Sequence, residues 1–447
     1  MVGVSGIRGV VGKDLTPALV ERYTAAFGAW AARTRASVVI GRDSRQSGPE
    51  FARAAALGLG AAGCAVIDVG LAPTPTIQLA VEYHRAGGGI AITASHNPIE
   101  WNALKFIGPD GVFLDEADGT RVLELARQNG RPRAPGATTL EADAGAIERH
   151  LAGVLELGVI AVPRIRARRF RVALDTVRGA GGAIMPTLLE RLGCEVRAIN
   201  LETDGMFPRP PEPLPEHLHE LATLTAGTGA DLGFAVDPDV DRLAIVDEHG
   251  APIGEDYTLA FAVRSVLGGG RKAAGPVVCN LSTSLVVEDA ARECGASVVR
   301  TPVGEAYVAR AIRELHAPVG GEGNGGVIYP ALHAGRDAPL AAALVLELLA
   351  RERVSVSALV ARAPRYVMVK AKVPRGAALG PAYSALRRRF EDAQADERDG
   401  LRLAWRDRWL HVRPSNTEPI VRLIAEAPEA SAARDLIEEA RRLCAAS

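Results

Sequence analysis

The sequence predicts an α/β fold, in which three related βαβ-containing domains with mixed sheets and a smaller C-terminal α+β domain surround a central cleft. Three observations lead to this prediction. A strand–helix–strand pattern occurs three times, each copy runs on into a further short apolar strand, and the C-terminal part of the chain follows a different pattern. The length of 447 residues is enough for about three domains.

The repeat can be read directly from the residues. Its first copy contains SVVIGRDSR and GAAGCAVIDVG, its second FRVALDTVRGAGG and ERLGCEVRAIN, and its third GPVVCNLSTS and RECGASVVRTP, each pair separated by a helical stretch. Gly63, Gly193 and Gly295 stand where each helix would end in a left-handed residue. Each copy is therefore a βαβ unit, whose crossover makes the neighbouring strands parallel.

The third strand of each copy leads into a polar or glycine-rich turn. These segments are GIAITASHNP, DLGFAVDPDVDR and APVGGEGNGG. Because ligands bind beyond the carboxyl ends of the strands in such sheets, the three turns are expected to face one cleft.

The predicted domains cover residues 1–147, 148–252, 253–362 and 363–447. A segment rich in Pro and Gly, residues 130–145, is expected to be a linker. The last domain is predicted from strands around the loop RPSNTEP, followed by an amphipathic helix.

Composition narrows the class of protein. The net charge of −1 favours neither nucleic acid nor an anionic membrane as a partner. No window approaches the roughly 18 uninterrupted apolar residues of a membrane helix, and the N-terminus lacks the pattern of a signal peptide. The five cysteines are scattered and form no C-x-x-C pair, which suits a reducing compartment. We therefore expect a cytoplasmic protein.

The segment DPDVDR predicts a metal site. It places Asp237, Asp239 and Asp241 at alternate positions, so that an extended chain points all three carboxylates to one face. Adjacent like charges need a cation, and hard oxygen ligands suit Mg²⁺ or Ca²⁺. The competing interpretation is a solvated acidic turn.

The segment TASHNP offers a hydroxyl beside an imidazole. Ser95 on its own is better explained as a helix cap or turn residue than as a nucleophile, and His96 on its own is better explained as a structural residue. Lys105 favours a catalytic interpretation of this segment. It is one of only five lysines among 52 basic residues, and it can lose its proton where an arginine cannot. Together the three residues can supply a nucleophile and a proton carrier.

Two further loops suggest ligand binding. GGEGNGG is either a flexible loop or a backbone that approaches a ligand closely, with Glu322 and Asn324 binding hydroxyls. RPSNTEP offers a guanidinium, hydroxyls and turn N–H groups, a suitable cradle for phosphate. Its candidate residues are Arg413, Ser415, Asn416 and Thr417. Near the N-terminus, Arg8, Arg42 and Arg45 are weaker candidates for phosphate binding. A nucleophile, a metal site, a hydroxyl-binding loop and a phosphate cradle together suit phosphoryl transfer on a polyol phosphate.

Across essentially the whole chain, these four motifs and their order resemble the α-D-phosphohexomutase family. TASHNP is similar to its phosphoserine loop, DPDVDR to its metal loop, GEGNGG to its sugar loop and RPSNTEP to its phosphate loop. The resemblance implies an intramolecular phosphotransferase of the isomerase class that interconverts hexose 6-phosphate and hexose 1-phosphate. It also implies a hexose 1,6-bisphosphate as intermediate and activator, a small sugar phosphate as partner, and a monomer or homodimer.

The resemblance also implies residue roles. Ser95 would carry the phosphoryl group and, with the three aspartates, hold Mg²⁺. The other catalytic positions would be His96, Lys105 in proton transfer, Arg242 and Arg8. Glu322 and Asn324 would bind sugar hydroxyls, and the residues of RPSNTEP would bind the phosphate that does not react.

This sequence departs from the family pattern at a few positions. Many members have Gly where Ala103 stands, and bacterial members often read G-E-x-S-G-H in the sugar loop, where this chain has Asn324 and Gly326. The E-x-N-G pattern of the sugar loop resembles archaeal-type glucosamine-phosphate mutases and acetylglucosamine-phosphate mutases, and this resemblance implies glucosamine phosphate as substrate. Asn416 stands where many glucosamine-specific members have Gly, and RPSNTEP supports the alternative, mannose or glucose phosphate. A phosphatase and a non-catalytic sugar-phosphate-binding protein remain the rivals from other classes.

Overall fold

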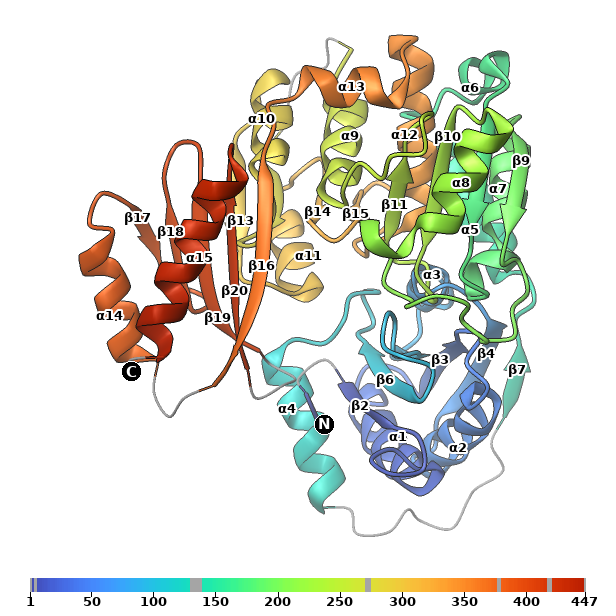
Figure 1. Cartoon of the computed structure of the whole chain (residues 1–447). Helices are drawn as coiled ribbons and strands as arrows, with labels where there is room; N and C mark the ends of the chain where they lie inside the picture. The colour runs from blue at the N-terminus through green and yellow to red at the C-terminus, as the bar shows by residue number, and fades with distance from the viewer. Residues whose placement is uncertain are drawn as a thin grey trace.

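The structure is a computed structural model that describes residues 2–3, 6–128, 139–269, 275–375, 379–415 and 420–445. Four sheets follow one another along the chain, and Figure 1 shows them as four bodies coloured in turn from blue to red. Three sheets are mixed, as the sequence predicted, and the last sheet is antiparallel.

The three mixed sheets share one strand order. In each, two parallel βαβ strands adjoin a third parallel strand, which pairs with an antiparallel fourth. The orders are β6-β5-β3-β4, β11-β10-β8-β9 and β15-β14-β12-β13. The first sheet also has β1 and β2 at one edge and β7 at the other. Its strands are β1 (Val2–Gly3), β2 (Gly6–Val10), β3 (Ser37–Arg42), β4 (Ala65–Leu71), β5 (Gly88–Ile92), β6 (Trp101–Ile107) and β7 (Leu140–Ala142).

The second and third sheets have four strands each. Those of the second are β8 (Arg171–Asp175), β9 (Glu195–Ile199), β10 (Leu232–Val236) and β11 (Leu243–Val246). Those of the third are β12 (Val277–Asn280), β13 (Val298–Thr301), β14 (Gly320–Glu322) and β15 (Gly326–Ile328). Strands β5 and β10 are buried along their whole length, as apolar parallel strands between helical layers are expected to be.

Helices cover these sheets. Those that flank the first sheet are α1 (Pro17–Ala31), α2 (Gly48–Ala61), α3 (Thr74–His84) and α4 (Glu116–Gln128). The middle of the chain adds α5 (Ala146–Glu156), α6 (Val162–Arg168), α7 (Met185–Arg191), α8 (His219–Thr228), α9 (Asp256–Leu267), α10 (Leu285–Glu293), α11 (Glu305–Glu314), α12 (Ala338–Glu352) and α13 (Val356–Arg362).

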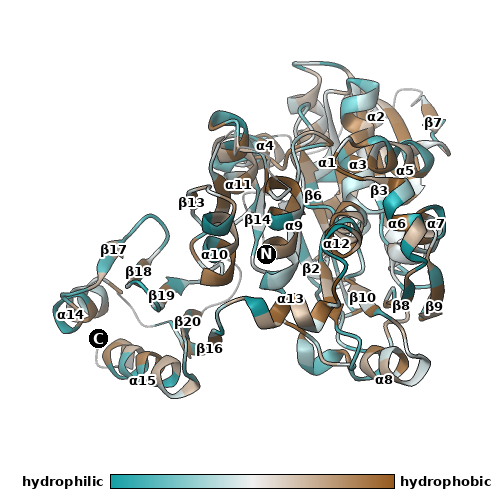
Figure 2. Ribbon diagram, turned by 90° about the horizontal axis from the view of Figure 1, so that it is seen from above, coloured by the Kyte–Doolittle hydropathy of each residue, from teal (hydrophilic) through white to brown (hydrophobic). Residues whose placement is uncertain are grey.

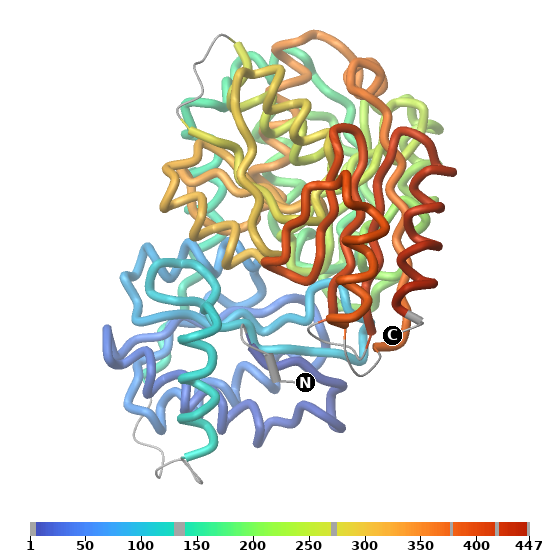
Figure 3. Tube along the Cα trace, turned by 90° about the vertical axis from the view of Figure 1, so that its left-hand side faces the viewer, coloured from blue at the N-terminus to red at the C-terminus, as the bar shows by residue number. Residues whose placement is uncertain are grey.

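The C-terminal domain is a five-stranded antiparallel sheet with two helices, in the order β16-β20-β19-β18-β17. Its strands are β16 (Val367–Pro374), β17 (Gln394–Asp396), β18 (Leu401–Ala404), β19 (Trp409–Pro414) and β20 (Ile420–Ala427), and its helices are α14 (Gly380–Arg389) and α15 (Ala430–Ala445). Figure 3 shows this red domain beside the yellow strands and helices of the third. The two are joined by hydrogen bonds such as that from the Leu285 backbone N–H to Glu426, 2.8 Å long.

The second and third domains share a single hydrophobic core, which helix α12 crosses. Its first thirteen residues, 338–350, are all buried, and Asp337 caps it by accepting a hydrogen bond from the Leu340 backbone N–H. The first and last domains have cores of their own. Figure 2 shows the corresponding contrast, with α9 largely brown and the outer helix α14 largely teal.

The expectation of a linker over 130–145 was wrong for residues 140–142. These residues belong to strand β7, which pairs in parallel with β4, whereas residues 130–138 lie outside the described residues. All three residues are exposed, so the strand carries no alternating apolar signal. Within the residues that the structure describes, no helix combines the length and apolar character needed to cross a membrane.

Candidate active site

Ser95 lies in the turn that follows β5. Its φ of +49° places it in the left-handed region, which costs an ordinary residue about 1–2 kcal/mol. The side chain is almost fully buried, and its hydroxyl donates a 2.8 Å hydrogen bond to Asp237 Oδ2. Ser95 is therefore held at the metal loop predicted from the sequence, although 142 residues separate the two along the chain.

Arg45 holds this turn in place, a role that was not predicted from the sequence, where Arg45 was only a weak candidate beside the phosphate loop. Its buried guanidinium donates hydrogen bonds to four backbone carbonyl groups, those of Ser95, Asn97, Pro98 and Trp101. Asp43 orients it through an ion pair of 3.1 Å and also accepts a hydrogen bond from the Thr93 hydroxyl. The motif GRDSR thus forms a support beneath the serine turn.

The three aspartates lie together between β10 and β11, all fully buried. Each offers a carboxylate oxygen within 4.8 Å of the others. Burial, followed by repulsion from Asp241 and Asp239, raises the pKa of Asp237 well above its ordinary value. For Asp239 burial acts in the same direction, but attraction and hydrogen bonding to Lys105 outweigh it, so its pKa is lowered.

The hydrogen bonds of the triad leave two carboxylate oxygens available to a cation. Asp239 Oδ2 accepts from Lys105 and Thr74, and Asp241 Oδ2 pairs with Arg336. The Oδ1 atoms of both aspartates are buried and have no hydrogen-bond partner. Such orphaned anionic oxygens are costly unless a ligand satisfies them. The triad can therefore hold a divalent cation, and its all-oxygen donors suit Mg²⁺.

Positive side chains surround this centre. Lys105 Nζ lies 2.6 Å from Asp239 and 3.7 Å from Asp241. Burial disfavours its charge, but attraction to the two carboxylates prevails and the pKa of Lys105 is raised. Arg242 pairs with Glu212 at 3.1 Å, and Arg8 donates a 2.7 Å hydrogen bond to Asn97. This cluster suits the charge of a phosphoryl group.

His96 lies beside the serine, with Nδ1 3.3 Å from Ser95 Oγ. Burial, followed by repulsion from Arg242, Arg8 and Lys105, lowers the pKa of His96 well below 6.5. The imidazole is therefore neutral at pH 7, and among these groups it is an uncharged hydrogen-bonding partner.

The sugar-loop residues lie close to the triad. Glu322 ends β14 and is buried; its Oε1 accepts from Asn280 Nδ2 and the Gly304 backbone N–H, and its Oε2 accepts from Arg336 at 2.6 Å. Burial opposes its charge, but attraction to Arg336 lowers the pKa of Glu322, so it is ionised. Asn324 accepts a hydrogen bond from the Gly326 backbone N–H and shapes the turn.

Arg336 was not predicted as a site residue from the sequence. It follows β15 in the segment GRD and connects Asp241 of the metal loop to Glu322 of the sugar loop. A single arginine in a turn is too common a feature to mark such a role from sequence alone.

Two of the phosphate-loop residues, Arg413 and Ser415, lie at the end of β19. Arg413 is buried and donates from Nε to Asp399 Oδ2 at 2.9 Å. Asp399 also accepts from the backbone N–H of Val303, which precedes the Gly304 that bonds to Glu322. Ser415 is buried at the end of the strand. Asn416 and Thr417 lie outside the described residues.

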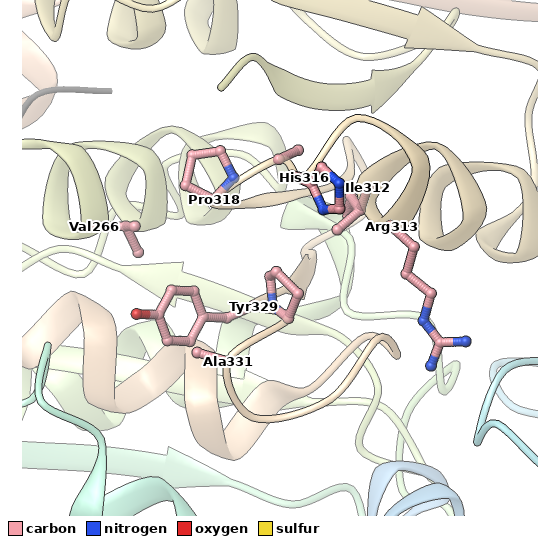
Figure 4. A pocket seen from close by; sticks show the side chains of 9 residues that line it. Val266, Ile312, Arg313, His316, Pro318, Tyr329 and Ala331 are labelled. Atoms are coloured by element: carbon pink, nitrogen blue, oxygen red, sulfur yellow. The ribbon is translucent and has the colours of Figure 1, made fainter. Parts of the chain in front are cut away.

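A surface hollow of about 480 Å³ lies on the third domain, away from these groups. Figure 4 shows Tyr329, His316 and Arg313 among the side chains that line it. None of the predicted site residues lines this hollow, so we do not connect it with the chemistry.

Four sequence families match the chain in succession. They are described as phosphoglucomutase/phosphomannomutase alpha/beta/alpha domain I (residues 1–132), domain II (148–250), domain III (254–366) and C-terminal domain (368–443).

Two similar curated proteins match almost end to end. A phosphoglucomutase/phosphomannomutase from Thermococcus kodakarensis is 37% identical over 98% of this chain and 97% of its own length. A probable phosphoglucosamine mutase from Methanopyrus kandleri is 36% identical over 98% of this chain and 96% of its own.

Two solved structures of phosphohexomutases are also similar to this chain. A phosphoglucomutase/phosphomannomutase family protein from Burkholderia thailandensis is 29% identical, with a TM-score of 0.83 over 99% of this chain and 96% of that one. An N-acetylphosphoglucosamine mutase from Aspergillus fumigatus, in complex with GlcNAc-6P and magnesium, is 16% identical, with a TM-score of 0.62 over 100% and 95%. At that identity the second likeness shows the fold alone. The chain belongs to the α-D-phosphohexomutase family and is an intramolecular phosphotransferase of the isomerase class.

Proposed function

We propose that this phosphohexomutase interconverts glucosamine 6-phosphate and glucosamine 1-phosphate through a phosphoserine at position 95 and a 1,6-bisphosphate intermediate. The observation that supports the covalent mechanism most directly is the 2.8 Å hydrogen bond from Ser95 Oγ to Asp237 Oδ2, because it joins the candidate nucleophile to the carboxylate triad. A protein that only binds sugar phosphates needs no nucleophile there.

The transfer conserves atoms and charge in each half-reaction. The bond from Ser95 Oγ to phosphorus breaks, and a bond from the free sugar hydroxyl oxygen to the same phosphorus forms. Lys105 Nζ, which is protonated beside Asp239, gives its proton to Ser95 Oγ and takes the proton of the sugar hydroxyl in its place. After the bisphosphate has reoriented in the site, its other phosphate is transferred to Ser95 by the reverse of these changes.

Asp237, Asp239 and Asp241 would hold Mg²⁺ together with the phosphorylated Ser95. When bound, the ion offsets negative charge on the phosphoryl group. Cationic side chains of the protein contribute in the same way, since Arg242 and Arg8 lie near the serine turn. The pair Lys105–Asp239 fixes one oxygen of Asp239 so that the other remains available. A hexose 1,6-bisphosphate would restore the phosphoserine whenever Ser95 loses its phosphate.

Substrate positioning is assigned to the other two loops. Arg413, Ser415, Asn416 and Thr417 would hold the phosphate that does not react. Glu322 and Asn324 would bind sugar hydroxyls. In the described conformation the acceptor positions of Glu322 are occupied by protein donors, so a sugar hydroxyl must replace one of them or donate alongside.

Glucosamine phosphate is favoured by the E-x-N-G sugar loop and is consistent with the relative from Methanopyrus kandleri. The second candidate is mannose or glucose phosphate, which the RPSNTEP loop and the relative from Thermococcus kodakarensis favour. Purified protein assayed with glucosamine, mannose and glucose 6-phosphates, with Mg²⁺ and glucose 1,6-bisphosphate, separates them. A kcat/KM highest for mannose or glucose phosphate would reject the first choice.

The covalent mechanism is tested with Ser95→Ala. Intact-mass measurement of the wild type should show a fraction heavier by one phosphate, absent from Ser95→Ala, and mutase turnover should be lost. Ser265→Ala, which changes a buried serine on α9, is the matched control and should keep both. Near-normal turnover in Ser95→Ala would reject the phosphoserine, and phosphate release without bisphosphate dependence would indicate a phosphatase.

A further inference from the structure

Arg336 is the meeting point of two functional loops. Its side chain is buried, and its three nitrogens each contact a different carboxylate: Nη2 lies 2.5 Å from Asp241, Nη1 2.6 Å from Glu322 and Nε 3.0 Å from Glu305. Because a guanidinium presents its N–H groups in a rigid planar fork, these contacts fix the three carboxylates relative to one another.

The aliphatic stem of Arg336 fills a specific space. A Cβ atom added at Gly326 would lie 2.2 Å from Arg336 Cδ and 2.9 Å from Cγ, closer than real atoms approach. In this chain the space beside the sugar loop is therefore already taken, and a side chain at 326 and the arginine at 336 exclude one another.

We propose that Arg336 takes the place of a side chain at position 326 and acts as a positioning residue that holds Asp241 of the metal loop and Glu322 of the sugar loop in one fixed arrangement. The catalytic part of this inference rests on the proposed function. The steric part rests only on the geometry of Arg336 and Gly326.

The backbone around Arg336 supports a fixed position. The next residue, Asp337, caps α12 and accepts hydrogen bonds from His150 at 2.8 Å and His333 at 3.0 Å, all three being buried. Arg336 thus extends from an anchored turn. By pairing with Asp241 Oδ2 it also leaves the buried Oδ1 of Asp241 without a hydrogen-bond partner, 3.7 Å from Arg242 Nε.

If Arg336 served only to neutralise negative charge, a lysine at position 336 should replace it. A lysine at 336 would keep the positive charge and much of the stem, but a single ammonium cannot reproduce a planar fork that reaches three separate carboxylates. The positions of Asp241 and Glu322 would then no longer be set together. Comparing Lys with Arg at this position therefore separates positioning from charge.

The steric part is tested by thermal unfolding of the full-length chain, with no need for turnover. Gly326→Ala should lower the Tm in the wild type and in Arg336→Lys, because both keep the stem. It should cause a much smaller further decrease in Arg336→Ala, where only Asn324 Oδ1, at 3.1 Å, still lies close to the added Cβ. An equal effect of Gly326→Ala in all three backgrounds would overturn the proposal, whether that effect is large or absent. If Arg336→Ala does not fold, the steric test rests on Gly326→Ala in the wild-type and Arg336→Lys backgrounds, where an unchanged Tm in both would overturn it.

The positioning part is tested by kinetics and by Mn²⁺ binding, measured by electron paramagnetic resonance. Arg336→Lys should lower kcat/KM by at least about tenfold and should change Mn²⁺ affinity. Arg264→Met is the matched control, because Arg264 is equally buried but pairs with Glu293 away from the triad. Wild-type kinetics and Mn²⁺ affinity in Arg336→Lys would reject positioning. A wild type inactive on every sugar phosphate would reject the proposed function instead, leaving the steric result intact.

Discussion

Arg45 Nη2 donates a 2.7 Å hydrogen bond to the backbone carbonyl oxygen of Ser95, a residue whose own backbone is left-handed. The same guanidinium binds the carbonyl groups of three neighbouring residues, so the strained turn is held from one side by a single buried cation. Unfavourable backbone conformations of this kind persist only where surrounding groups enforce them.

We expect Arg45→Lys to lower kcat by at least about tenfold while leaving the circular dichroism spectrum unchanged. An ammonium cannot reach four carbonyl oxygens at once, so the orientation of Ser95 should relax. Arg42→Lys is the control, because Arg42 makes a single carbonyl hydrogen bond, to Asp43. Full turnover in Arg45→Lys would show that the turn holds its shape without this support.

Asp239→Asn should weaken Mg²⁺ binding and reduce turnover steeply, because it removes one of three anionic ligands and breaks the ion pair with Lys105. Calorimetric titration with Mg²⁺ measures the first effect, and raising the Mg²⁺ concentration should restore part of the turnover. Asp231→Asn, at a partly exposed aspartate that bonds the Arg171 backbone, should change neither. Unaltered metal dependence in Asp239→Asn would remove DPDVDR from the metal site.

Arg413→Ala should raise KM far more than Ser415→Ala, because charge-assisted contacts of a guanidinium to phosphate are about twice as strong as neutral hydrogen bonds. The increase should appear in both reaction directions, since either sugar phosphate would present its unreacting phosphate to this loop. Steady-state kinetics from the 6-phosphate and the 1-phosphate check this. An effect in one direction only would contradict a shared cradle.

The buried side chain of His411 should make the free energy of unfolding depend on pH. It lies between Ser282 of the third domain and the Asp399 carbonyl, and burial lowers its pKa to about 4. The unfolded chain, with a His pKa near 6.5, binds the proton more readily, so stability is complete above about pH 6.5 and falls as the pH decreases towards 4, by about 3 kcal/mol in all.

Replacing His411 by Gln should therefore flatten the profile of unfolding free energy between pH 7 and 4. His249→Gln is the control, because the His249 side chain is 74% exposed. A profile as steep in His411→Gln as in the wild type would assign the acid sensitivity to other groups.

Local patterns in the sequence predicted much of the site. The alternation of three aspartates is visible within five residues, and the structure confirms that their carboxylates lie together. The βαβ repeat was equally visible, because buried parallel strands are short apolar runs. These signals depend only on neighbours along the chain.

Contacts between distant segments could not be predicted in the same way. Thr74 bonds to Asp239 across 165 residues, and Arg336 reaches Asp241 across 95. Neither residue belongs to a motif with its own chemistry, so only the folded chain reveals the partnership. Strand β7 was missed for a different reason, since three exposed residues carry no periodic signal.

The shared strand order of the three mixed sheets puts the candidate site residues at equivalent positions. Ser95 and the aspartate triad lie in the turns that precede β6 and β11, while Glu322 ends β14 and Asn324 lies in the turn before β15. Each candidate group therefore stands where the third strand of its sheet meets the antiparallel neighbour. The serine hydroxyl, the carboxylates and the sugar-loop residues are thus carried by corresponding hairpins of three similar scaffolds.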